Sequence, residues 1–152
     1  MAPEPGDVLL AKGRTPFGRA VEWATSSPYS HAAILTPQGK LVESKEFHGI
    51  RTVPVDTYTG DWFRVACGPQ QRLRAVAWAL SRVGQKYGWN DVAHDWNRPF
   101  VGLALAKRTQ LRAVDCSGLV CWAFSKAGVT LTRRPFATPA DLGWSTMLQP
   151  LD

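Results

Sequence analysis

The segment Asp115-Cys116-Ser117-Gly118-Leu119-Val120-Cys121-Trp122-Ala123-Phe124 carries the clearest structural pattern of this sequence. Its apolar residues recur at intervals of three and four, which is the spacing of one buried face of an α-helix. Asp115 is a common N-cap residue, and Gly128 follows the last apolar position as a helix stop often does. The pattern therefore predicts a helix that begins at Cys116 and ends before Gly128.

Cys116 would then lie in the first turn of that helix. Unpaired backbone N–H groups and the positive end of the helix dipole favour a thiolate over a thiol at such a position. The alternative is that Cys116 is only a small residue of the buried face, because free cysteine is among the most buried residue types. A nucleophilic role therefore requires a base elsewhere in the chain.

Length and composition indicate one globular domain over residues 1–152, with 45% hydrophobic and 20% charged residues. The formal net charge of +6 and the pI near 9.6 favour an anionic partner, such as a cell-wall polymer, a phospholipid surface or nucleic acid. Four of the seven tryptophans lie outside obvious helical stripes, and they either line a groove or sit at the edge of the core. They are Trp62, Trp89, Trp96 and Trp144.

The sequence shows no targeting or metal-binding pattern. It has no apolar run that could span a bilayer, and its N-terminus lacks the basic and apolar regions of a Sec signal, so we expect synthesis in the cytoplasm. The three cysteines are an odd number without metal-type spacing. A disulfide framework, a metal site and a cofactor are therefore not expected.

The remaining periodicity predicts an α+β chain with a small antiparallel sheet. Strands are expected at 7–11, 31–36, 41–47, 50–55 and 62–67, and helices at 15–26 and 69–84. The second helix would bury Leu73, Val76, Ala77, Leu80 and Val83. Residues 91–96 and 100–107 are assigned to short helical segments, and the capping pattern Thr138-Pro139-Ala140-Asp141 begins a last short helix.

Three histidines could serve as the base, and turn chemistry favours His31 over His48 and His94. Pro37 suits a type I turn and Gly39 the left-handed position of a bulged hairpin, which pairs Thr36 with Lys40. In that register His31 and Glu43 share one face of the sheet as diagonal neighbours. A two-residue turn at Gln38-Gly39 would put Glu43 on the opposite face.

With Glu43 beside it, His31 could be held in the correct tautomer and its imidazolium stabilised. Taken alone, His31 fits a surface or hydrogen-bonded core residue, and Glu43 fits a solvent-facing strand residue. Together with Cys116, however, they form the set that a thiol nucleophile needs: a base and a group that orients the base.

These residues resemble a known family. Asp115-Cys116-Ser117-Gly118-Leu119-Val120 is similar to the nucleophile motif of NlpC-type cell-wall cysteine peptidases, and Gln85-Lys86-Tyr87-Gly88-Trp89 to the aromatic segment that precedes it. Here the histidine strand comes first, with Gly6-Asp7-Val8-Leu9-Leu10, Ser27-Pro28-Tyr29-Ser30-His31-Ala32 and Lys40-Leu41-Val42-Glu43-Ser44 ahead of the cysteine helix. That order resembles the circularly permuted branch, which contains YiiX-like hydrolases and, more distantly, lecithin:retinol acyltransferase-like proteins.

The resemblance implies a papain-like α+β fold in which a small antiparallel sheet packs against the cysteine helix. It implies that Cys116 is the nucleophile, His31 the base and Glu43 the orienting residue. It also places Tyr87 near the thiol and lets Asp115 and Ser117 contact a substrate amine. Tyr29, close before the histidine, is a further candidate for lining the site.

The leading functional hypothesis is a peptidoglycan amidase or endopeptidase, in which the backbone N–H of Cys116 and a second donor hold the oxyanion. The alternatives are a lipid acyl hydrolase or acyltransferase, and a non-catalytic structural or carbohydrate-binding module. We expect a monomer that does not bind nucleic acid, because no base-stacking motif accompanies the arginines. Delivery to the wall by phage or by a secretion apparatus, and binding of an inhibitor or immunity protein, are left open by the sequence.

Overall fold

The computed structural model describes residues 1–152 apart from 14–18, 20–21, 24–26, 46–47, 86–106 and 134–136. Most of the helix predicted at 15–26 and the segments predicted at 91–96 and 100–107 therefore lie outside the described residues. Among the described helices, none has the length and apolar character that crossing a membrane requires.

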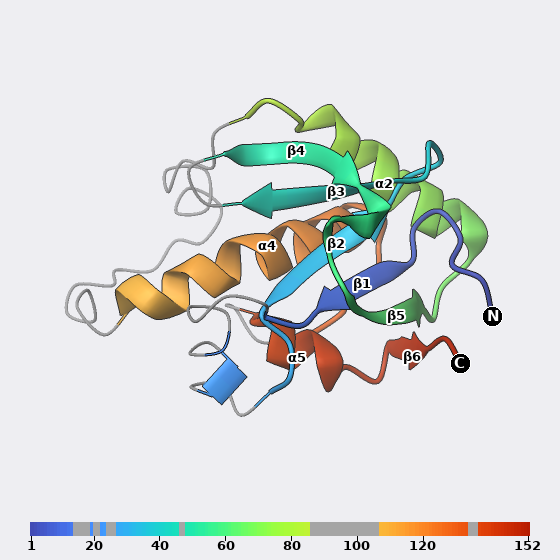
Figure 1. The fold of residues 1–152 in the computed structure, drawn as a ribbon. Helices are drawn as coiled ribbons and strands as arrows, with labels where there is room; N and C mark the ends of the chain where they lie inside the picture. The colour runs from blue at the N-terminus through green and yellow to red at the C-terminus, as the bar shows by residue number, and fades with distance from the viewer. Residues whose placement is uncertain (14–18, 20–21, 24–26, 46–47, 86–106, 134–136) are drawn as a thin grey trace.

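A six-stranded antiparallel sheet forms the centre of the molecule, with the strand order β4-β3-β2-β1-β5-β6 (Figure 1). The strands are β1 (Val8–Ala11), β2 (His31–Leu35), β3 (Lys40–Lys45), β4 (Gly49–Pro54), β5 (Gly60–Val65) and β6 (Leu148–Pro150). The helices are α2 (Pro69–Ser81), α4 (Lys107–Lys126) and α5 (Pro139–Gly143), and a 3₁₀ turn η1 spans Val55–Thr57. The five predicted strands are confirmed within a few residues, and β6 is an addition.

The hairpin between β2 and β3 has the predicted register. Ile34 pairs with Val42 and Leu35 with Leu41, and the backbone N–H of Thr36 donates to the carbonyl of Lys40 at 2.8 Å. Gly39 has a φ of 69°, the left-handed conformation that this bulged turn requires and that glycine adopts without strain. The turn thus brings residues 31 and 43 to the same face at the same end of the sheet.

Helix α4 packs on one face of the sheet against β2 and β3, and α2 packs beside it (Figure 1). The predicted apolar face of α4 is confirmed, because all of its residues from Cys116 to Phe124 at this spacing are buried in the main core. They are Cys116, Leu119, Val120, Ala123 and Phe124. A smaller apolar cluster covers the other face of the sheet, with Tyr58 and Trp62 packed against it. That cluster consists of Leu9, Ala33, Leu35, Leu41 and Val53.

The predicted start of the cysteine helix is wrong. Helix α4 begins at Lys107 rather than at Cys116, so Asp115 is an interior residue and not its N-cap. Residues 107–114 contain neither proline nor glycine, and nothing in that stretch stops a helix from continuing toward its N-terminus. Cys116 therefore lies in the middle of α4, where the helix dipole and unpaired N–H groups do not act on its thiol.

The predicted buried face of the second helix is also wrong in part. Helix α2 buries Ala75, Val76 and Ala79. Of the predicted face, Leu73 and Ala77 are exposed, and so is Val83, which follows the end of the helix. The small side chains Ala75 and Ala79 belong to the main core, which α2 and α4 share. The short helix α5 begins as predicted, since Thr138 and Asp141 form a reciprocal capping box at its N-terminus.

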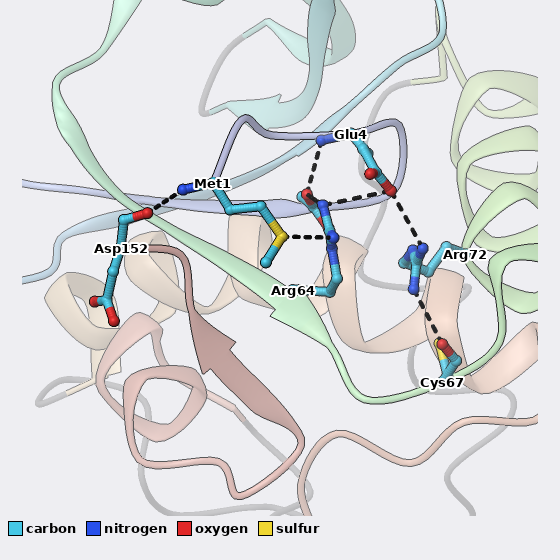
Figure 2. Close-up of polar contacts among 7 residues, drawn as sticks. Met1, Glu4, Arg64, Cys67, Arg72 and Asp152 are labelled. Carbon is cyan, nitrogen blue, oxygen red and sulfur yellow. Dashed lines mark hydrogen bonds and ion pairs between the residues drawn. The ribbon is translucent and has the colours of Figure 1, made fainter.

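An ionic network anchors the N-terminal segment to β5 and α2 (Figure 2). The buried carboxylate of Asp7 accepts two hydrogen bonds from Arg64, at 3.1 and 2.8 Å, and a third from the backbone N–H of Glu4 at 2.7 Å. The exposed Glu4 side chain lies 3.4 Å from Arg64 and 3.5 Å from Arg72, whose Nη1 donates to the carbonyl of Cys67. This network holds β1 in place at its N-terminal end.

Replacing Asp7 with asparagine should lower the free energy of unfolding by about 2 kcal/mol, because two charge-assisted hydrogen bonds of Arg64 lose their anion. Glu4→Gln is the matched control and should cost less than about 0.5 kcal/mol, since Glu4 is exposed to solvent. Urea denaturation measures both values. Equal losses for the two variants would contradict this account of the network.

Candidate active site

The fold brings together His31, Glu43 and Cys116 from three elements. His31 is the first residue of β2, Glu43 lies within β3, and Cys116 lies within α4. Nε2 of His31 is 2.5 Å from Oε2 of Glu43, and the imidazole also hydrogen bonds to the side chain of Cys116. Because Nε2 is directed to the carboxylate, Nδ1 is the ring nitrogen left for the thiol.

The electrostatics of this cluster favour a charged imidazole. Burial alone would lower the pKa of His31, but the charge of Cys116 and hydrogen bonds to Cys116 and Glu43 raise that pKa to about 9. An imidazolium beside a thiolate is the ion pair from which cysteine nucleophiles react. The His31 ring thus lies between two groups, Cys116 and Glu43, that both favour its charged form.

Glu43 is a fully buried carboxylate with several donors. It accepts from His31 and, at 2.9 Å, from Nε of Arg51, and it shares a hydrogen bond with the hydroxyl of Tyr58. Burial would raise the pKa of Glu43, but these three partners, His31 foremost, lower it to about 2. Glu43 is therefore ionised over the whole physiological pH range.

Arg51 and Tyr58 were not singled out by sequence reasoning. Extending the predicted antiparallel pattern by one strand would have suggested Arg51, which is the direct cross-strand partner of Glu43 on β4. Tyr58 follows η1, and its ring centroid lies 4.7 Å from that of His31. No periodicity signals Tyr58, because a turn between two strands positions it.

Tyr29 lies against β5 and next to Gly143 of α5. Its hydroxyl donates to Asp61 at 2.8 Å, and its ring meets Phe63 edge-on at 6.0 Å. Burial and the carboxylate of Asp61 raise the pKa of Tyr29 to about 12, so the hydroxyl stays protonated. These contacts place Tyr29 at the β1–β5 side of the sheet, and its predicted role in lining the site stays a prediction.

The predicted contact of Ser117 with a substrate amine stays a prediction, and the structure places this residue in the interior. Ser117 is fully buried, and its hydroxyl donates to the carbonyl of Ala137 at 2.6 Å, which joins α4 to the segment before α5. Tyr87 and the side chain of Asp115 lie outside the described residues. Of the other histidines, His48 is exposed in the turn between β3 and β4, and His94 is outside the described part.

Comparison with known proteins identifies a shared fold. No family model and no curated protein matches the sequence. Among solved structures, the crystal structure of the metalloprotein YiiX from Escherichia coli O157:H7, a DUF1105 protein, matches with a TM-score of 0.66. The alignment covers 100% of this chain and 98% of that chain at 15% sequence identity. The chain therefore has a YiiX-like mixed α+β fold, and the papain-like, NlpC-type part of the resemblance stays a prediction.

YiiX is described as a metalloprotein, and a metal centre requires several His, Cys, Asp or Glu ligands close together. Within the part of the chain that the structure describes, His, Cys, Asp and Glu side chains do not gather in any group of three or more that could hold a metal. Glu43 has both oxygens engaged, with His31 and Arg51. The described residues of this site do not fit a metal centre.

The titration of His31 can be measured directly by NMR. We expect a midpoint near pH 9 in the wild type and a lower one in Cys116→Ala, because the variant removes the thiolate that favours the imidazolium. Since the folded pKa lies above the unfolded value of 6.5, this group stabilises the fold fully below pH 6.5 and loses that contribution as the pH rises toward 9.

Cys121→Ala is the control for this titration, because Cys121 belongs to the same helix and is not a hydrogen-bond partner of His31. Its midpoint should equal that of the wild type. An unchanged midpoint in Cys116→Ala would show that the thiol does not act on the imidazole.

Proposed function

We propose that this protein is a cysteine hydrolase in which Cys116 is the nucleophile, His31 the general base and acid, and Glu43 the residue that orients His31. The observation that carries the proposal is the position of the His31 ring between the thiol of Cys116 and the buried carboxylate of Glu43. A histidine with a carboxylate at one nitrogen and a thiol at the other is the arrangement by which a thiol is activated.

The chemistry follows from this order of groups. The Cys116 thiolate attacks a carbonyl carbon, and the imidazolium of His31 gives its Nδ1 proton to the leaving group as the acyl-enzyme forms. Nδ1 then takes a proton from water, which attacks the thioester and frees the acid. The carboxylate of Glu43 stabilises the imidazolium in both half-reactions.

The source of the oxyanion donors differs from the sequence-based expectation. Since Cys116 lies inside α4, its backbone N–H belongs to the i to i−4 hydrogen bonds of the helix and does not point at a substrate. The backbone N–H of Cys116 is therefore not a donor to the oxyanion in this proposal. Donors from other side chains or loops must supply this stabilisation.

We propose an amide bond of bacterial cell-wall peptides as the substrate. The resemblance of the Cys116 segment to cell-wall peptidases and the net charge of +6, which suits an anionic polymer, support this assignment.

Incubating purified peptidoglycan with the wild type and with Cys116→Ala tests the assignment. We expect soluble fragments from the wild type only, because the variant lacks the nucleophile while its small residue still fits the buried position. Mass spectrometry of the fragments gives the bond that is cut, and circular dichroism shows that the variant is folded. Equal release by both proteins would refute Cys116 as nucleophile.

Absence of release from the folded wild type would contradict the cell-wall assignment. The same pair of proteins would then be tested on phospholipid vesicles, where fatty acid released by the wild type alone supports the acyl-lipid alternative. Inactivity on both substrates would favour a non-catalytic module.

Within the active enzyme, His31→Ala should lower the rate by about 10² to 10⁴, which is the usual contribution of a general acid–base group. Glu43→Gln should lower it less, because this substitution alters orientation and charge but leaves the base in place. Steady-state kinetics on the identified substrate compare the two variants. Equal losses would indicate that Glu43 contacts the substrate or is purely structural.

A further inference from the structure

Both oxygens of the Glu43 carboxylate are engaged, and they face different partners. Oε2 lies 2.5 Å from Nε2 of His31, whereas Oε1 accepts from Nε of Arg51 at 2.9 Å. A carboxylate held at both ends cannot rotate about its terminal bond without losing a charge-assisted hydrogen bond. Its orientation toward His31 is thus determined partly by Arg51.

Arg51 is placed for this role by the sheet. It lies directly opposite Glu43 in the β3–β4 register, and its side chain is 35% exposed while Glu43 is fully buried. Arg51 therefore brings a positive charge to a buried anion while part of its own guanidinium stays hydrated. This arrangement avoids the larger desolvation cost of burying both ions.

Tyr58 closes the cluster from the segment after η1. Its ring packs against His31 at a centroid distance of 4.7 Å with the planes 40° apart, and its hydroxyl shares a hydrogen bond with Glu43. Nζ of Lys45 lies 3.2 Å from the same hydroxyl and donates to it. Because its oxygen accepts from Lys45, the proton of the Tyr58 hydroxyl is free to be donated to Glu43.

We propose that Arg51 and Tyr58 are positioning residues that act through Glu43: they hold its carboxylate against Nε2 of His31, so that Nδ1 faces Cys116. The inference deepens the proposed function, on which it rests for its catalytic meaning. The charged and titratable groups that face this cluster are Cys116 from α4, Glu43 and Lys45 from β3, Arg51 from β4, and Tyr58.

The reactivity of Cys116 toward iodoacetamide tests the positioning role without a substrate. Alkylation consumes the thiolate, and peptide mapping by mass spectrometry separates Cys116 from Cys67 and Cys121. We expect Arg51→Met to slow the alkylation of Cys116 at pH 6 by about tenfold, the effect of losing one charge-assisted hydrogen bond.

Three further substitutions test the charge of Arg51, the specificity of its effect and the Tyr58 hydroxyl. Arg51→Lys keeps the cation and should recover part of the rate, whereas Arg74→Met removes an exposed arginine of α2 and should leave the rate unchanged. Tyr58→Phe keeps the ring on His31 but removes the hydroxyl. The alkylation rate of Cys116 should therefore fall less in this variant than in Arg51→Met. Thermal unfolding shows that each variant is folded under the assay conditions.

The decisive measurement is the effect of Arg51→Met on the alkylation rate in the Glu43→Gln background. If Arg51 acts through Glu43, adding Arg51→Met to Glu43→Gln should change the alkylation rate by less than about twofold. A full tenfold loss in both backgrounds, or no loss from Arg51→Met alone, would overturn the proposal. These outcomes are independent of peptidoglycan cleavage, so a wrong substrate assignment and a wrong positioning role give different results.

Discussion

The register of the β2–β3 hairpin is the constraint on which the candidate site depends. Gly39 in its left-handed conformation sets the turn, and the turn pairs Thr36 with Lys40. Because side chains alternate along a strand, a slip of one residue would move Glu43 to the opposite face and separate it from His31. A single glycine far from the thiol thus determines whether the histidine has a carboxylate partner.

The sheet also explains how a carboxylate can be both buried and ionised. Glu43 is covered on all sides, yet the cation on the neighbouring strand and the imidazole on the other side offset the cost of removing its charge from water. The three groups depend on one another: without Arg51 the anion is less stable, and without the anion the imidazolium is less stable. The site is therefore better described as one charged cluster that includes Arg51 than as three residues alone.

The parts of this arrangement that local chemistry controls could be predicted from the sequence. Turn residues gave the hairpin register, and apolar spacing gave the buried face of α4 that includes Leu119 and Phe124. The start of α4 could not be predicted, since Asp115 fits an N-cap as well as a helix interior. The alanine face of α2 and the placement of Tyr58 depend on tertiary contacts, which no local pattern records.

The position of Cys116 inside α4 bears on how the proposed activation of its thiol would work. At a helix N-terminus the dipole would stabilise a thiolate without help, and a weakly held histidine would suffice. In the middle of a helix that contribution is lost, so the positive charge of His31 must provide the stabilisation. Cys116 and Glu43 both raise the pKa of His31, so that charge also depends on Glu43 staying ionised and correctly oriented. The length of α4 and the contact between Arg51 and Glu43 are thus linked. A thiol far from the helix end receives no help from the dipole, so the proposed chemistry depends more on the residues that hold His31, namely Glu43 with Arg51 and Tyr58.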